Sequence, residues 1–145
     1  MSLKMKHSIY SFIIWLVVAI FLIIFFFSGD TINTWGDNRT KTLLITALFF
    51  IGYVGNTILW IIFRKRKNKI VKDERDDYIS LKSTSAGFIT TGIYIFILSI
   101  SLYIIYENVG SVPIAWVWFI AYSLFIVSYL STSAFSLIYY YKSGK

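Results

Sequence analysis

The chain has 145 residues, of which 57% are hydrophobic and 14% are charged, and its formal net charge is +7. A soluble domain has about 25% charged residues, so this composition excludes an ordinary soluble globular domain. The chain has no Cys and one His, His7, which excludes disulfides and thiolate ligands and leaves almost no basis for a histidine metal site or a Ser-His-Asp triad.

Four apolar runs are each long enough to cross a bilayer as a helix, which takes about 20 residues. They predict spans at about 9–27, 42–63, 84–106 and 114–141. The first run is followed by no small-residue cleavage site, so it is interpreted as an uncleaved span and not as a signal peptide. We therefore expect an all-α integral membrane protein in which residues 1–145 form one domain, with four transmembrane helices in an up-down bundle.

Small and polar residues mark one face of the second span, where Gly52 and Gly55 lie three residues apart and Asn56 lies beside them. Small residues let membrane helices approach closely, and an amide can hydrogen-bond across the contact. A helix-packing face is the favoured interpretation. The alternative is a kink or gap that contacts a ligand.

The third and fourth spans have similar faces. The third begins with small and hydroxyl residues that include Gly87 and Thr91, and the fourth has a hydroxyl residue every four positions, at Ser128, Thr132 and Ser136. Helix packing again explains these faces best. A hydroxyl-lined pathway through the membrane is the alternative.

The only long charged segment, 64–82, holds eight of the fourteen Lys and Arg residues and four of the seven acids. It lies in the predicted loop 64–83 and begins with a basic cluster, which would lie against anionic lipid headgroups at about 1 kcal/mol per basic residue. Its second part has Lys and Asp at i,i+4 spacing, which favours a short cytoplasmic amphipathic helix that leads into the third span. The acids lack the spacing of a calcium loop, so we expect a solvated or partner-docking face and no metal. The basic cluster is Arg64, Lys65, Arg66 and Lys67.

Within this segment the stretch from Asp73 to Lys82 reads DERDDYISLK. Together with the small and hydroxyl residues that follow, it resembles the central segment of a family of uncharacterised prokaryotic small membrane proteins, which have four predicted spans and a D-E-R-x-x-x-I-x-x-K pattern. The resemblance implies the same topology, and the family has no established activity to carry over. It marks as candidate partner-binding residues Asp73, Glu74, Arg75, Ile79 and Lys82.

The distribution of positive charge predicts the orientation, because cytoplasmic loops of membrane proteins are rich in Lys and Arg. With four spans, both termini and the loop 64–83 share one side, which holds twelve of the fourteen Lys and Arg residues. We therefore predict a protein of the cell membrane with both termini in the cytoplasm. Since these charges determine topology, the net charge does not indicate nucleic-acid binding, and no nucleic-acid partner is expected.

No Asp, Glu, Lys, Arg or His lies inside the four predicted spans. Ionisable residues within the membrane mark proton relays and ion paths, so their absence argues against a proton-coupled transporter or a charged-ring channel. The acids of 73–77 have no His, Cys or phosphate-binding glycines beside them, so we expect no enzyme and no cofactor. The leading interpretation is a non-enzymatic accessory or regulatory membrane protein. It would dock a partner or anionic lipid through 64–82 and associate with itself or with a larger membrane protein.

A second interpretation is a small transport or export component, or an immunity-type protein against membrane-active peptides. It would use the amide and hydroxyl groups of the spans. If Asn56, Thr91 and Thr132 line one solvent-reachable cavity, transport is favoured. If they are buried at dry helix contacts, the regulatory interpretation is favoured.

Overall fold

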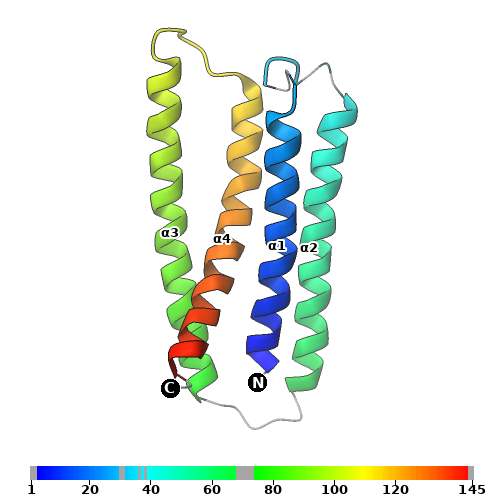
Figure 1. Cartoon of the computed structure of the whole chain (residues 1–145), viewed down its shortest axis with the longest axis vertical. Helices are drawn as coiled ribbons and strands as arrows, with labels where there is room; N and C mark the ends of the chain where they lie inside the picture. Colours follow the sequence, from blue (N-terminus) through cyan, green and yellow to red (C-terminus); the bar gives the residue numbers. More distant parts are fainter. Residues whose placement is uncertain (1–2, 30–31, 36, 38, 68–73, 144–145) are drawn as a thin grey trace.

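The computed structural model of the chain describes residues 3–29, 32–35, 37, 39–67 and 74–143, without the side chains of 64–67. Each of its four helices is long and apolar enough to cross a membrane, and no strand occurs in these ranges. The predicted all-α class with four spanning helices is therefore confirmed. The helices run up and down, and both termini lie at one end, which we call the inner end (Figure 1). They are α1 (Leu3–Phe27), α2 (Arg39–Lys67), α3 (Glu74–Tyr106) and α4 (Ile114–Ser143).

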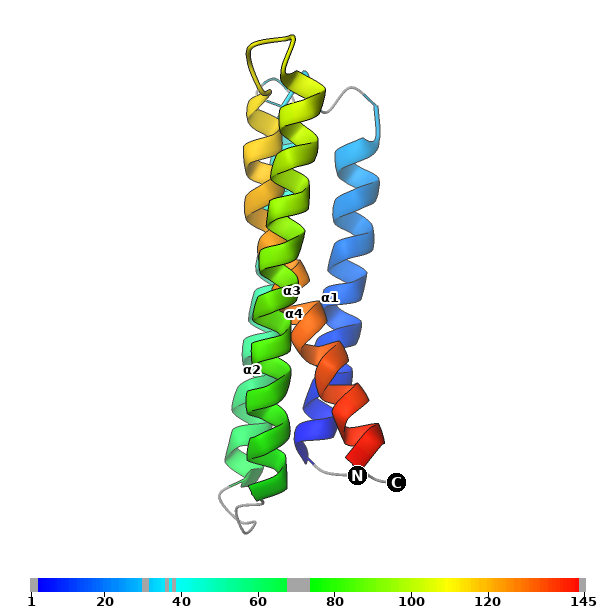
Figure 2. The same cartoon turned by 90° about the vertical axis from the view of Figure 1, so that its left-hand side faces the viewer.

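The helices do not lie beside one another in chain order. The pairs that pack extensively are α3 with α4, α4 with α1, and α1 with α2, and Figure 1 shows the same row. Figure 2 shows α4 inclined against the other helices, and Figure 1 shows its last turns close to the inner end of α3. Helices α1 and α4 therefore form the centre. Helix α3, at one end of the row, has only 6% of its most apolar stretch buried, against 28% for α1 and for α4. Most of its apolar surface therefore faces away from the bundle.

The helix ends follow local chain chemistry. Gly29, just after α1, has a φ of 66°, the left-handed conformation that commonly ends a helix and that glycine adopts without strain. Pro113 comes directly before α4, where its missing N–H group leaves no intrahelical bond unmade. The connection between α3 and α4 turns at Gly110, whose φ is 74°.

The amphipathic helix predicted before the third span is the first part of α3. This helix runs without a break for 33 residues, about 50 Å at 1.5 Å per residue, and so exceeds a hydrocarbon core of about 30 Å. Its first turn contains Glu74, Asp76 and Asp77, where the helix dipole favours negative charge. The predicted loop 64–83 is thus helical at both ends, and 68–73 lie outside the described residues.

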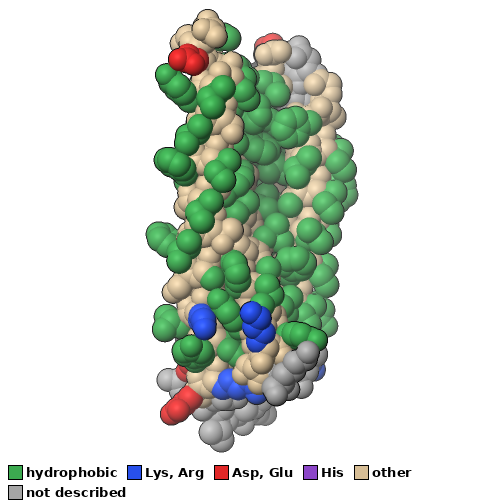
Figure 3. All heavy atoms as spheres, turned by 60° about the vertical axis from the view of Figure 1, so that its left-hand side comes forward, with side chains coloured by type: hydrophobic (Ala, Val, Ile, Leu, Met, Phe, Trp, Pro, Cys, Tyr) green, Lys and Arg blue, Asp and Glu red, His purple; other side chains and the backbone are tan. Residues whose placement is uncertain are grey.

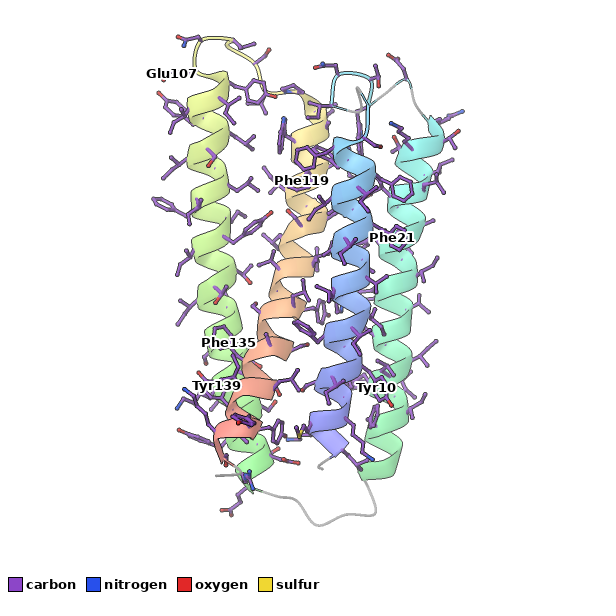
Figure 4. The ribbon with its side chains drawn as sticks, viewed as in Figure 1. Tyr10, Phe21, Glu107, Phe119, Phe135 and Tyr139 are labelled. Atoms are coloured by element: carbon purple, nitrogen blue, oxygen red, sulfur yellow. The ribbon has the colours of Figure 1, made fainter. Side chains whose placement is uncertain are left out.

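The half of the core farther from the termini, which we call the outer half, is built from aromatic rings. Trp15 is fully buried and stacks on Tyr129, with the ring centroids 4.7 Å apart and the planes 4° from parallel. Phe26, also fully buried, packs against Phe119 at 4.5 Å between α1 and α4 (Figure 4). Trp35 lies in the connection between α1 and α2, where it is buried, and its ring lies 6.0 Å from that of Phe26. These rings close the bundle on the side away from the termini.

Glycines set the closest helix contacts. A Cβ atom at Gly87 of α3 would lie 2.2 Å from Thr132 Oγ1 and 3.1 Å from Thr132 Cα on α4. A Cβ atom at Gly52 of α2 would lie 2.7 Å from Val18 Cγ2 on α1. A larger residue would force the Val18 side chain to shift at Gly52, and would force both the Thr132 side chain and its backbone to shift at Gly87.

The contact at Gly87 predicts an unequal response to alanine. Gly87→Ala should lower the stability of the protein by about 1–3 kcal/mol, the usual range for overpacking, because Thr132 and its backbone must move. Gly92→Ala is the matched control on the same helix, since its Cβ would meet nothing within 4 Å. Alanine favours a helix over glycine, so the control should be as stable as the parent or more so. Unfolding in mixed detergent micelles measures both, and an equal loss would contradict the α3–α4 contact.

Candidate functional site

The start of α3 is tied to both ends of the chain. Lys4 Nζ of α1 forms an ion pair with Asp77 Oδ1 at 2.5 Å. The Tyr140 hydroxyl, near the end of α4, donates a hydrogen bond to Asp76 Oδ1 at 2.8 Å. Figure 3 shows the inner end of the molecule carrying Lys, Arg and acidic side chains below an apolar surface. These bonds hold the first turn of α3 in one position against α1 and α4.

The next turns of α3 add two anchors. Ile79 is 2% exposed and is directed into the bundle. Lys82 Nζ lies 5.1 Å from the centroid of the Tyr139 ring and 5.6 Å from that of Tyr78, within range for cation–π attraction. Tyr139 lies toward the inner end of α4, while Glu107 marks the opposite end (Figure 4).

The other predicted docking residues divide into two groups. Glu74 and Arg75 lie exposed at the surface of the first turn of α3. Asp73 lies outside the described residues, and the basic cluster 64–67 forms the last turn of α2 with side chains that are not described.

An apolar surface of α3 points away from the bundle at the same level. Tyr78 is 63% exposed and Leu81 is 71% exposed, and they lie one and two turns after Glu74, which is also exposed. The start of α3 therefore has two apolar sides. Ile79 lies on the side that is buried in the bundle, and Tyr78 and Leu81 lie on the side that is exposed. We call Glu74, Tyr78 and Leu81 the outer face of α3.

Hydroxyl groups connect the inner halves of α1, α2 and α4. Ser8 Oγ and Ser136 Oγ lie 2.8 Å apart between α1 and α4. Ser133 Oγ donates to Ser11 Oγ at 3.2 Å, and Ser11 Oγ donates to Asn56 Oδ1 at 2.8 Å. Asn56 and Ser136 were candidate residues, whereas Ser8, Ser11 and Ser133 were missed. The sequence pattern that could have identified these serines is a pair three residues apart on each of α1 and α4.

The remaining polar candidates lie at the contact between α3 and α4. Thr91 Oγ1 donates to the carbonyl oxygen of Gly87 in its own helix at 2.8 Å, and Thr132 packs on Gly87 from α4. Ser131, next to Thr132, donates to the carbonyl oxygen of Ser128 at 3.2 Å. Gly55, on α2, would place a Cβ 3.7 Å from Ile14 Cδ1 of α1, an ordinary packing distance. The polar candidates are thus divided between two helix contacts.

The chemistry that this end can perform is limited by its groups. In the described ranges, no three His, Asp or Glu side chains come together as metal ligands would. Two acids at the start of α3 are engaged, Asp77 with Lys4 and Asp76 with Tyr140. The arrangement is suited to holding a helix in place and to presenting its outer face.

The bond between Tyr140 and Asp76 predicts a measurable coupling. Tyr140→Phe and Asp76→Ala should each lower stability by about 0.5–1.5 kcal/mol, and the double variant should lose little more than either one, because all three remove the same bond. Tyr10→Phe is the control, since this exposed ring stacks on Phe63 and keeps that contact as Phe. A double-mutant cycle by unfolding in detergent measures the coupling, and additive losses would contradict the bond.

Comparison with known proteins agrees with this architecture. The family model described as predicted membrane protein (DUF2178) matches residues 5–143, which is nearly the whole chain. No curated protein and no solved structure matches the chain. With its four apolar helices, the chain therefore belongs to the DUF2178 family of predicted membrane proteins.

Proposed function

We propose that the protein is a non-enzymatic accessory or regulatory subunit of the cytoplasmic membrane, and that it docks a partner protein through the outer face of α3. The observation that supports this best is the fixed position of that face. Asp77 and Asp76 tie the first turn of α3 to Lys4 and Tyr140, so the outer face needs no ordering when a partner binds. Preorganisation of this kind reduces the entropy that binding must overcome.

The composition of the outer face fits a protein partner. Tyr78 and Leu81 offer large apolar surface beside the carboxylate of Glu74. Aromatic anchors flanked by polar groups are typical of protein interfaces. The guanidinium of Arg75 is exposed nearby and adds a polar rim.

The basic cluster at the end of α2 has a different role in this proposal. It would keep the inner end on the cytoplasmic side and close to anionic headgroups, so that both termini lie in the cytoplasm. The outer face would then sit near the membrane surface, where a membrane-bound or peripheral partner can reach it.

The arrangement of the polar candidates supports this proposal over transport or immunity against membrane-active peptides. Asn56 bonds to Ser11 at one helix contact, and Thr132 packs on Gly87 at another. A transport pathway would need these groups along one cavity. Their division between two helix contacts argues against one continuous transport pathway.

The proposal is tested by photocrosslinking in native membranes. A photoreactive residue at Tyr78, with mass spectrometry of the products, should give one discrete protein adduct. The matched control is the same residue at Phe96, which lies on α3 within the predicted third span and is 67% exposed, and which should give lipid adducts. Adducts at Tyr78 that contain only lipid or a second copy of this chain would refute partner docking at the outer face.

A further inference from the structure

Two buried side-chain nitrogens have no hydrogen-bond partner in the part of the chain that the structure describes, namely His7 Nε2 and Trp15 Nε1. Both belong to α1, and along that helix they lie on either side of Ser8 and Ser11. Eight residues separate them, about 12 Å at 1.5 Å per residue. The Trp15 side chain is 0% exposed, so no bulk solvent reaches its N–H group from the surface.

Unpaired groups of this kind are uncommon. A buried donor or acceptor without a partner costs about 1–3 kcal/mol, and in native proteins ordered water often fills the role. Elsewhere in this bundle the hydroxyls are paired, as Thr46 Oγ1 bonds to the carbonyl of Thr42 and to the Tyr122 hydroxyl. The two orphaned nitrogens both belong to the inner half of α1, where His7 packs edge-on against Phe63 of α2 and Trp15 stacks on Tyr129 of α4.

The side chains between the two nitrogens have unused bonding capacity. A serine hydroxyl can donate once and accept twice, and an amide has two donors. In the cluster of Ser11, Ser133 and Asn56, the bonds run from Ser133 to Ser11 and from Ser11 to the Asn56 oxygen. The Asn56 amide donors and several hydroxyl acceptors therefore stay available, which meets the two to four polar partners that a buried water needs.

The region has a closed end and a polar end. At Trp15 the ring of Tyr129 stacks at 4.7 Å and the ring of Phe49 lies at 6.0 Å, and Val18, the next turn of α1 away from the inner end, is 5% exposed. At the other end, Ser8 Oγ bonds to the Lys4 carbonyl near the inner surface. The polar groups of this region therefore lie between the aromatic stack and the inner end.

We infer that α1, α2 and α4 enclose a hydrated site, in which water molecules bind between His7 and Trp15, enter from the inner end and stop at the Trp15–Tyr129 stack. The lining groups are hydroxyls, an amide, an imidazole and an indole. They suit small neutral molecules that donate and accept hydrogen bonds, and water is the ligand. The site does not depend on partner docking at the outer face of α3.

The absence of Cys allows a direct test by cysteine accessibility. Ser11→Cys and Ser133→Cys are treated with a small hydrophilic thiosulfonate in membrane vesicles. Thiols react as thiolates, which form only where water is present, so both should react at least about tenfold faster than the controls. The controls are Val18→Cys, on the same face of α1 beyond the stack, and Ile13→Cys, which is 50% exposed toward lipid. Rates no faster than that of Val18→Cys would overturn the inference.

A second measurement needs no substitution in the site. In the unmodified protein in lipid nanodiscs, the Trp15 indole proton is followed by NMR after transfer to deuterated water, with Trp15→Phe used only to assign the signal. It should exchange long before the backbone amides of Val18 and Leu22, which lie beyond the stack. An indole proton protected for as long as those amides would show a dry site and overturn the inference, even if the cysteine variants failed to fold.

Discussion

Close contact of helix α4 with α3 on one side and α1 on the other is the constraint on which the rest of the structure depends. In a bilayer the surrounding lipid is as apolar as the helices, so helices associate through packing and hydrogen bonds between them. Gly87 admits Thr132 to within contact of the α3 backbone, and the Ser8–Ser136 pair joins α4 to α1 at 2.8 Å. With α4 placed by these contacts, its last turns reach the inner end, where Tyr140 meets Asp76.

This central position of α1 and α4 divides the molecule by chemistry. The outer half is filled with aromatic rings around Phe26 and Trp15, and the inner half carries serines and an amide. Charged residues then follow at the inner surface, as Figure 3 shows on one face. Both candidate sites arise from this gradient, since the outer face of α3 is fixed by the surface charges and the hydrated site lies among the serines.

Much of the fold follows from the sequence. Four uncharged apolar runs require four helices, and the continuous pattern after Glu74 predicts the helix that leads into the third span. Small residues in the spans indicate candidate packing positions, and a Cβ atom at Gly52 or Gly87 would crowd Val18 or Thr132 of the neighbouring helix. A single periodic face, however, does not say which helix covers it. The row of α3, α4, α1 and α2 depends on the match between faces far apart in the chain.

The candidate site shows the same limit. Of the motif residues, Ile79 is buried within its own bundle, and Lys82 lies over the Tyr139 ring of its own chain. A buried Ile beside exposed Tyr78 cannot be assigned to a side from spacing alone, because α3 carries apolar residues on two sides. The burial of Trp35 could not be predicted from its neighbours in the loop, because it depends on contact with Phe26, nine residues earlier. Ser8 and Ser11 were missed because two serines are a weak signal until Ser133 and Ser136 are seen opposite them.

The central claim, that α1 and α4 meet through their serines while α2 and α3 lie at the two ends of the row, is tested most directly by disulfide trapping in membranes. The chain has no Cys, so Ser8→Cys with Ser136→Cys gives a clean pair. The hydroxyl oxygens are 2.8 Å apart, so sulfur atoms in their place need only a small movement to reach the S–S bond length of about 2.05 Å. Mild oxidation should join this pair within one chain and leave Ile58→Cys with Phe88→Cys, on α2 and α3, unjoined. Efficient trapping of the α2–α3 pair with none at the serines would contradict the account.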